Sequence, residues 1–469
     1  VEVERQLKKR QRGQAVRLEF EVGTSRFMRR FMTQEMNLEK EDMYQIDGPL
    51  DMTVFFGFCG IKGYNHLRYP EAHPHSPWSM LELKRTPETN IFDMIREKDL
   101  LIHLPYESFD ESVVNFLYSA ANDKDVLAIK QTLYRVSSSS PVVQALEKAV
   151  QNGKQVTVLM EVKARFDEAN NILMARRLEK AGAHVIYGLV GLKTHSKCTL
   201  VIRREKDGIR RYVHVATGNY NASTAKLYTD LGILTCSDRF GIDASAFFNL
   251  LSGYSDPPIW DSFIVAPINL RQRCIELIDR EIHFAKNGED AHMIAKMNSL
   301  LDKGIIEKLY EASQAGVKIE LIVRGICVLI PGIPGVSDNI TVRSIVGRFL
   351  EHSRIFWFRN GGREELYVSS ADWMPRNLND RVELMVPIED PEIKRRLKQM
   401  VDIELSDNQK AHIMQADGTW LKTISAENQL CAQEYFQKIA EKRDAEDEMT
   451  LAQKLEPYTP VLGHGDGSD

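Results

Sequence analysis

The sequence has few of the features that mark membrane, secreted and nucleic-acid-binding proteins. Its six cysteines are scattered among 469 residues without a Cys-x-x-Cys pair, which argues against a disulfide framework and favours a reducing, cytoplasmic compartment. No uncharged stretch reaches the roughly 18 to 20 residues that a membrane-spanning helix needs. The formal net charge is -5 at pH 7, whereas domains that bind nucleic acid usually carry a basic excess. We therefore expect no nucleic-acid partner, although a local basic cleft for an anion is compatible with this charge.

The chain also lacks an initiator methionine and a signal peptide. It begins at Val1 and continues directly into a charged segment, residues 2–12. This start is not typical of a complete polypeptide, so we expect the sequence to be a piece of a longer protein. Its hydrophobic content of 43% and charged content of 27% are those of a globular protein, and its length predicts about three domains.

The sequence does contain an internal duplication. Two motifs, Thr194-His195-Ser196-Lys197 and Glu351-His352-Ser353-Arg354, each follow a strand-like run and precede a β-rich segment that leads to a short polar cluster. Upstream of them, residues 153–160 align with residues 316–323 without a gap. The period is about 160 residues, which is the size of a domain and too long for a solenoid repeat.

Short strand-like runs alternate with longer helical patterns in both copies. This alternation is typical of βαβ units that form a mixed or mostly parallel sheet with helices outside. We therefore predict an α/β fold with two tandem domains related by pseudo-twofold symmetry, over residues 105–268 and 269–469, the second ending in a helical tail. Part of a helical or α+β domain is expected to precede them over residues 1–104. The tandem prolines of Asp256-Pro257-Pro258 predict the boundary between the copies, because they end regular structure.

The predicted symmetry would bring His195 and His352 into one cleft, since equivalent edges face each other across such an axis. A neutral imidazole is a nucleophile toward phosphorus and a protonated one can donate to the leaving oxygen, and both forms are accessible near neutral pH. A phosphoryl group also needs positive charge around its oxygens. Basic residues stand near predicted strand ends or beside the histidines in both copies: Arg135, Lys163, Arg165, Lys193, Lys197, Arg324 and Arg354. The repetition favours a catalytic pair over two unrelated structural histidines.

One acid follows the polar cluster at the same spacing in each copy, Asp230 in the first and Glu383 in the second. A carboxylate that accepts the second ring N–H of a catalytic histidine fixes its tautomer and orientation. The symmetry predicts an exchange, in which Glu383 orients His195 and Asp230 orients His352. The alternative is an acid that caps a strand or pairs with a nearby arginine such as Arg381.

Seven separated motifs follow one another in order along the chain. They are Ile129-Lys130-Gln131-Thr132-Leu133-Tyr134-Arg135, Glu161-Val162-Lys163-Ala164-Arg165-Phe166-Asp167-Glu168, Thr194-His195-Ser196-Lys197, Thr217-Gly218-Asn219-Tyr220-Asn221, Leu227-Tyr228-Thr229-Asp230, Val323-Arg324-Gly325-Ile326-Cys327 and His352-Ser353-Arg354. Together they closely resemble bacterial polyphosphate kinases of the first type. The resemblance covers nearly the whole chain, from the end of the family's helical domain through both catalytic domains, which are in turn similar to the phospholipase D superfamily.

The phospholipase D signature is His-x-Lys followed by an Asp, and here the corresponding Asp positions hold Ile202 and Arg359. The polyphosphate kinase family shows the same departure. The resemblance implies a phosphotransferase that reversibly moves the terminal phosphoryl group of ATP to inorganic polyphosphate, through a phosphohistidine. A phospholipase D-like phosphodiesterase or nuclease is the main alternative, and a noncatalytic polyanion-binding scaffold is the second.

The resemblance also implies roles for individual residues. His195 would be the phosphorylated nucleophile and His352 its acid–base partner, which also touches nucleotide phosphate. ATP and phosphate contacts are expected from Tyr228, Arg324, His352, Lys197 and Arg354. Arg135 and Arg165 correspond to a site for Mg²⁺ and phosphate, and because arginine cannot ligate a metal we expect them to hold the phosphates that Mg²⁺ bridges. Family members are commonly homo-oligomers and some associate with the membrane surface, which predicts a homo-oligomer in the cytoplasm or peripheral at the inner membrane.

Overall fold

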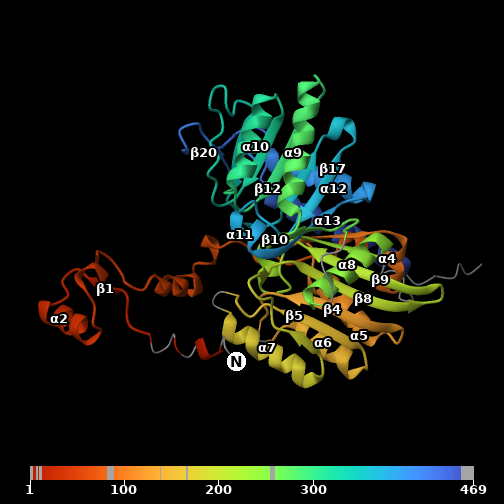
Figure 1. The fold of residues 1–469 in the computed structure, drawn as a ribbon, viewed down its shortest axis with the longest axis horizontal. Coiled ribbons are helices and arrows are strands. Elements are labelled where there is room, and N and C mark those ends of the chain that lie inside the picture. The colour runs from red at the N-terminus through yellow and green to blue at the C-terminus, as the bar shows by residue number, and fades with distance from the viewer. Residues whose placement is uncertain are drawn as a thin grey trace, which may run out of the picture. The chain divides into compact units, whose positions relative to one another are not determined.

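The computed structural model describes residues 4–6, 9, 13–81, 89–137, 139–164, 167–253 and 259–455. The chain divides into two compact units, Val1–Ala72 and His73–Asp469, which Figure 1 shows as a ribbon. The Asp256-Pro257-Pro258 turn lies outside the described residues. Of the helices in the described part of the chain, none combines the length and apolar character that crossing a bilayer requires.

Among its described residues, the first unit contains a two-stranded parallel sheet and the helix α2. Strand β1 (Leu18–Glu21) pairs with β2 (Met43–Ile46), and helix α2 (Arg26–Glu35) connects them. The helix begins after Ser25, because the Ser25 side chain accepts a hydrogen bond from the backbone N–H of Met28. Three short 3₁₀ helices complete the unit: Lys40–Asp42, Met52–Gly60 and Asn65–Leu67.

The second unit contains two large mixed sheets, one for each copy of the repeat. The first sheet has eight strands in the order β15-β10-β9-β8-β4-β5-β6, with β3 also paired to β10. Its strands from the first copy are β3 (Leu100–Leu104), β4 (Val126–Leu133), β5 (Gln155–Met160), β6 (His184–Ile186), β8 (Lys197–Glu205), β9 (Gly208–Ala216) and β10 (Tyr228–Thr235). Figure 1 shows helices α5 (Asn115–Asn122), α6 (Pro141–Gln151) and α7 (Glu168–Ala181) along one side of this sheet, and α4 (Ile91–Glu97) and α8 (Asp238–Leu251) complete the half.

The second sheet repeats this plan. It has ten strands in the order β11-β18-β17-β16-β12-β13-β14-β19-β20, and β7 (Lys193–Thr194) pairs with β18. The strands are β11 (Ile264–Ala266), β12 (His292–Met297), β13 (Lys318–Val323), β14 (Ile340–Ile345), β16 (Ile355–Phe358), β17 (Glu365–Ser369), β18 (Arg381–Pro387), β19 (Ala411–Met414) and β20 (Trp420–Lys422). Its helices are α9 (Leu270–Lys286), α10 (Lys303–Gln314), α11 (Pro375–Asn379), α12 (Pro391–Leu405) and α13 (Ala432–Leu455). The predicted fold class, two tandem phospholipase D-like α/β domains, is confirmed.

The repeated glycine has the same conformational role in both copies. Gly153 follows α6 with a φ of 78°, and Gly316 follows α10 with a φ of 98°. A side chain with a Cβ atom is disfavoured in this left-handed region, which commonly ends a helix. The next residues then enter β5 and β13, each in parallel register with the strand before the helix. The gapless match in the sequence therefore marks the turn from helix to strand.

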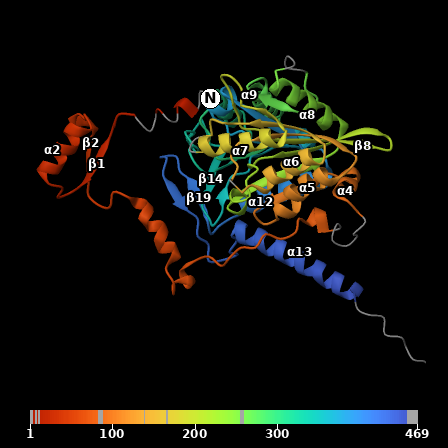
Figure 2. The ribbon, with the colours of Figure 1, turned by 90° about the horizontal axis from the view of Figure 1, so that it is seen from below.

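The C-terminal segment differs from the helical tail that the sequence predicts. Strand β19 pairs with β14 and forms a hairpin with β20 between α12 and α13. Figure 2 shows α13 as a long helix that ends the described chain. The hairpin is hard to detect because its two strands are short and β20 is exposed along its length, so little alternation of apolar and polar residues marks it.

The two sheets exchange one short strand each. Strand β15 (Leu350–Glu351) of the second copy lies parallel to β10 in the first sheet, where Leu350 is opposite Tyr228 and Glu351 is opposite Thr229. Strand β7 of the first copy lies parallel to β18 in the second sheet. Each exchanged strand directly precedes one of the two conspicuous histidines, so the exchange carries each histidine into the other half of the unit.

The burial of Trp373 in the core of the second half predicts a loss of stability when this residue is removed. Trp373 is fully buried and stacks on Phe356, with ring centroids 4.9 Å apart. We expect Trp373→Ala to lower the free energy of unfolding by about 3 to 5 kcal/mol, because it leaves a large cavity. The matched control is Trp420→Ala on exposed β20, which should change it by about 0.5 kcal/mol or less. Urea denaturation measures both, and equal losses would contradict the assignment of Trp373 to the core.

Candidate active site

The two histidines are fixed by backbone hydrogen bonds to the opposite halves. The backbone N–H of His195 donates to the carbonyl oxygen of Val382 on β18, at 2.9 Å, and that of His352 donates to the carbonyl oxygen of Thr229 on β10, at 3.2 Å. The next residue on β18 is Glu383, and the next residue on β10 is Asp230. The exchange of strands therefore places each histidine beside the acid of the other copy.

His195 and Glu383 form the first pair. The Nδ1 atom of His195 lies 2.9 Å from Oε2 of Glu383. That carboxylate also accepts hydrogen bonds from Ser370 Oγ at 2.5 Å and from Asn377 Nδ2 at 2.6 Å. Because Glu383 is wholly buried and accepts hydrogen bonds at both oxygens, we assign the proton to Nδ1 of His195. This tautomer leaves Nε2 without a proton.

His352 and Asp230 form the second pair. Nδ1 of His352 lies 2.9 Å from both carboxylate oxygens of Asp230, and Thr217 Oγ1 donates to Oδ1 of Asp230 at 2.6 Å. Gly218 is required at this point, since a Cβ atom there would lie 2.3 Å from the Asp230 side chain. The exchanged pairing that the repeat predicts is present in both directions, while the catalytic roles of these residues remain a prediction.

Thr217, Ser370 and Asn377 were not identified as functional residues from the sequence. Thr217 and Ser370 belong to the two polar clusters, at the equivalent place in each copy, and each donates to the acid of its own copy. Their equivalent positions in the two copies could have identified both residues from the sequence. Asn377 on α11 could not have been identified in this way, because nothing in the linear sequence relates it to Glu383.

The environment of His195 favours the neutral imidazole. Burial lowers the pKa of His195 well below its ordinary value of 6.5, and the positive charges of Lys197 and Arg381 lower it further. The charge on His352 is a further cause of the shift. Burial raises the pKa of Glu383, and the positive charge of Lys197 opposes this shift.

Lys197 is buried beside the first histidine. Its Nζ atom lies 3.1 Å from both ring nitrogens of His195. Burial lowers the pKa of Lys197 to about 7, against the opposing charge of Glu383. An amine with this pKa exists near neutral pH as a mixture of the charged and neutral forms, so it can take up or release a proton next to the imidazole.

The second pair is balanced differently. Burial lowers the pKa of His352, and the carboxylate of Asp230 opposes this shift. Burial acts to raise the pKa of Asp230, but the charge on His352 and its hydrogen bond outweigh it and the pKa is lowered. His352 therefore has a carboxylate at close range that favours its protonated form.

The predicted phosphate-binding arginines of the second copy are connected to His352. The Arg354 guanidinium is buried and donates to both carboxylate oxygens of Asp372, at 3.1 and 3.2 Å, and to the carbonyl oxygen of His352 at 2.6 Å. Arg324 donates to Oδ1 of Asn298 at 2.8 Å, and Nδ2 of Asn298 donates to the same carbonyl oxygen at 3.1 Å. Arg354 thus supplies a buried positive charge that is fixed in position. Arg324, by contrast, is only partly buried.

Two tyrosine rings flank the histidines. Tyr228, a predicted nucleotide contact, lies with its ring centroid 5.2 Å from that of His352. Tyr134 was not singled out from the sequence, and its ring meets that of His195 edge to face at 5.0 Å. Each ring shields one imidazole, which supports the dry environment that lowers both histidine pKa values.

The predicted Mg²⁺ and phosphate site is only partly described. Nε of Arg135 lies 3.0 Å from Oδ2 of Asp167, and both side chains are partly exposed. Arg165 lies outside the described residues. Among the residues that the structure describes, no three His, Cys, Asp or Glu side chains gather so that they could hold a metal ion.

Two α/β halves that share a pair of exchanged His–carboxylate couples define a duplicated α/β protein whose site is built from both halves. Three family models match successive parts of this chain: the polyphosphate kinase middle domain over residues 1–58, C-terminal domain 1 over residues 90–257 and C-terminal domain 2 over residues 263–433. The chain belongs to the polyphosphate kinase family.

Individual relatives agree with this assignment. The chain is 54% identical over 413 residues to a polyphosphate kinase of Halalkalibacterium halodurans and 48% identical over 440 residues to one of Thermosynechococcus vestitus. These matches cover 87% and 90% of this chain but 58% and 60% of the relatives. The crystal structure of a polyphosphate kinase from Porphyromonas gingivalis superposes with a TM-score of 0.82 at 34% identity, covering 92% of this chain and 65% of that one. The chain therefore spans about three fifths of its curated relatives.

The charge state of His195 can be tested directly. Because burial holds its pKa well below 6.5, we expect its imidazole to stay neutral while the pH falls from about 7.5 to about 6, a range in which an unperturbed histidine becomes largely protonated. Nuclear magnetic resonance of protein labelled at histidine measures this, with a His195→Gln variant to assign the signal. A titration midpoint at or above 6.5 would contradict the electrostatic description of the site.

Proposed function

We propose that the chain carries the active site of an enzyme that reversibly transfers the terminal phosphoryl group of ATP to inorganic polyphosphate. The observation that carries the proposal is the exchanged pair of His–carboxylate couples, with a neutral His195 whose Nε2 is available as a nucleophile. Membership of the polyphosphate kinase family supports the choice of substrates. ATP, ADP and polyphosphate are accordingly the proposed ligands.

In the forward direction, Nε2 of His195 forms a bond to the γ-phosphorus of ATP while the bond from phosphorus to the bridging oxygen breaks. Glu383 holds Nδ1–H of His195, and its negative charge balances the positive charge that the ring gains. Lys197, in its ammonium form, neutralises charge on the transferred phosphoryl oxygens. His352 donates a proton to the leaving oxygen of ADP; burial lowers the pKa of His352, which makes the imidazolium a stronger acid, and Asp230 opposes that shift.

In the second step, a terminal oxygen of polyphosphate attacks the phosphorus of phosphohistidine. The bond to Nε2 breaks and the neutral imidazole of His195 returns, while His352, which became neutral in the first step, takes a proton from the attacking oxygen. Both steps run in either direction, because the same groups serve the entering and the leaving oxygen. Mg²⁺, when bound through phosphates near Arg135, would neutralise phosphate charge.

The contacts of Tyr228 and Arg324 support their proposed roles toward the nucleotide. Tyr228 packs beside His352, and Arg324 is tied through Asn298 to the carbonyl oxygen of His352. A phosphate held by the partly exposed Arg324 would thus be close to the proposed acid–base group. The cytoplasmic location and the homo-oligomer remain predictions from the sequence.

The alternative function, that of a phospholipase D-like phosphodiesterase or nuclease, is less well supported. The position of the first signature Asp is held by Ile202 on β8, which carries no charge. The second is held by Arg359, whose guanidinium pairs with Asp290 at 3.0 Å and Glu364 at 2.9 Å. Neither residue supplies the acid that the phosphodiesterase signature contains, and we therefore favour the kinase reaction.

The nucleophile assignment predicts a covalent intermediate. Incubation with γ-labelled ATP should give a protein-bound label that is labile to acid and stable to alkali, as a phosphohistidine is. His195→Ala should lower the label by at least about a thousandfold, since the nucleophile is irreplaceable, while the exposed His184→Ala serves as the control. A label that survives in His195→Ala would overturn the assignment.

The acid–base assignment predicts a separate effect at the second histidine. His352→Ala should reduce polyphosphate synthesis by about a hundredfold to ten-thousandfold, the usual contribution of general acid–base catalysis. His283→Ala is the matched control, since His283 is exposed on α9. Synthesis is measured as long inorganic polyphosphate formed from ATP, and unchanged turnover in His352→Ala would remove this residue from the mechanism.

A further inference from the structure

Glu351, the residue directly before His352, is the centre of a buried polar network. Its Oε2 atom accepts hydrogen bonds from Lys296 Nζ at 2.7 Å and from Thr229 Oγ1 at 2.8 Å. Its Oε1 atom accepts one from Gln433 Nε2 at 2.6 Å. Lys296 also pairs with Glu404 of α12. Glu351 and Lys296 are both at most 3% exposed, so their hydrogen bonds are made away from water, where they are strong and costly to lose.

Gln433, in the first turn of α13, holds the strand that leads to His352. Besides Glu351, its Nε2 atom donates to the carbonyl oxygen of Phe349 at 2.9 Å, and its Oε1 atom accepts the Phe349 backbone N–H at 3.0 Å. One side chain thus satisfies both backbone groups of the residue before β15. The fit is close, since a Cβ atom at Gly347 would lie 2.4 Å from Gln433 Oε1.

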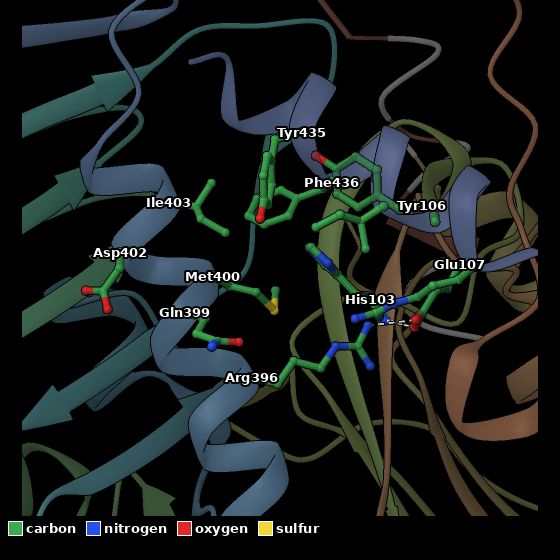
Figure 3. Close-up of a pocket in the computed structure, with 13 residues that line it drawn as sticks. His103, Tyr106, Glu107, Arg396, Gln399, Met400, Asp402, Ile403, Tyr435 and Phe436 are labelled. Carbon is green, nitrogen blue, oxygen red and sulfur yellow. Dashed lines mark hydrogen bonds and ion pairs between the residues drawn. The ribbon is translucent and has the colours of Figure 1, made fainter. Parts of the chain in front are cut away.

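The C-terminal helices also contact the part of the first half that supports Asp230. Phe436 of α13 meets the rings of His103 and Tyr106 at centroid distances of 5.1 and 5.5 Å, and His103 lies on β3, which pairs with β10. Figure 3 shows Arg396 of α12 extending to Glu107, where the two side chains form an ion pair of 2.7 Å. The helices therefore hold β15 and β3 on either side of β10.

The residue before the first histidine is bonded differently. The residue before His195 is Thr194, whose Oγ1 atom is buried without a hydrogen-bond partner among the described residues. Its backbone N–H donates to Glu161 at 2.8 Å, within the first copy. The repeat thus places a charged, multiply bonded residue before His352 and a small, neutral one before His195.

We propose that Glu351 and Gln433 are positioning residues for His352, which hold its strand so that Nδ1 stays 2.9 Å from the Asp230 carboxylate. Thr229, the residue directly before Asp230, donates a hydrogen bond to Glu351, so the same network fixes both members of the pair. The effect of this network on turnover rests on the proposed function, in which His352 is the acid–base group. The effect of the network on the geometry of His352 does not depend on the proposed function.

The experiment compares Gln433→Leu with the matched control Gln437→Leu, one turn later on α13. Gln437 is only partly buried and bonds to Glu441 of its own helix. Thr229→Val is the second variant in case Gln433→Leu fails to fold; it keeps the side-chain shape and removes the bond to Glu351 together with the hydrogen bond that Oγ1 accepts from the His352 backbone N–H. Nuclear magnetic resonance follows the strongly deshielded Nδ1–H proton of His352 in the full chain, assigned with a His352→Gln variant, and steady-state kinetics follow synthesis from ATP.

The His352 Nδ1–H signal should be lost or clearly shifted in Gln433→Leu and Thr229→Val and unchanged in Gln437→Leu. The kcat for synthesis should fall about tenfold or more with less than a twofold change in KM for ATP, because displacement of a catalytic group by a fraction of an ångström slows chemistry. A folded Gln433→Leu or Thr229→Val protein that keeps the wild-type signal and kcat would overturn the proposal. A wild-type chain that makes no polyphosphate counts against the proposed function alone, and the His352 signal still decides the positioning role.

Discussion

The pairing of two short exchanged strands is the constraint on which the rest of this structure depends. Strand β7 completes the sheet of the second half and β15 completes that of the first. Their parallel hydrogen bonds set the register of each histidine to within one residue, and a slip by one residue would turn the histidine away from its acid. Neither half contains both members of the His195–Glu383 pair or of the His352–Asp230 pair, so the site exists only when both halves are folded and packed.

The same packing determines the electrostatics. Burying two imidazoles, Lys197 and Arg354 within one interface concentrates positive charge in a place with little water, which disfavours further protonation. Glu383, Asp230 and Asp372 compensate for part of that charge through direct hydrogen bonds. A polyphosphate or nucleotide would supply the remaining negative charge, and a site arranged in this way binds its substrate partly by relieving its own electrostatic cost.

Much of the plan could be predicted from the sequence because the duplication doubled each signal. The strands β4 and β5, the glycines after the helices and the exchange of Asp230 and Glu383 follow from matching one copy against the other. The strands β7 and β15 could not be recognised, since two residues carry no periodicity. Asn377 and Gln433 were missed for a related reason: each acts through long-range hydrogen bonds that only the folded chain creates.

The two copies have also become chemically unequal at equivalent positions. In the second copy Arg354 is paired with Asp372 through both carboxylate oxygens, whereas in the first the corresponding residues are Lys197 and Asn219. An amide cannot neutralise an ammonium, and Oδ1 of Asn219 is buried with no hydrogen-bond partner among the described residues. Burial lowers the pKa of Lys197 to about 7, and the amide at the Asn219 position adds no negative charge to offset that shift. The replacement of a carboxylate by an amide is therefore one of the differences that make the surroundings of His195 chemically unlike those of His352.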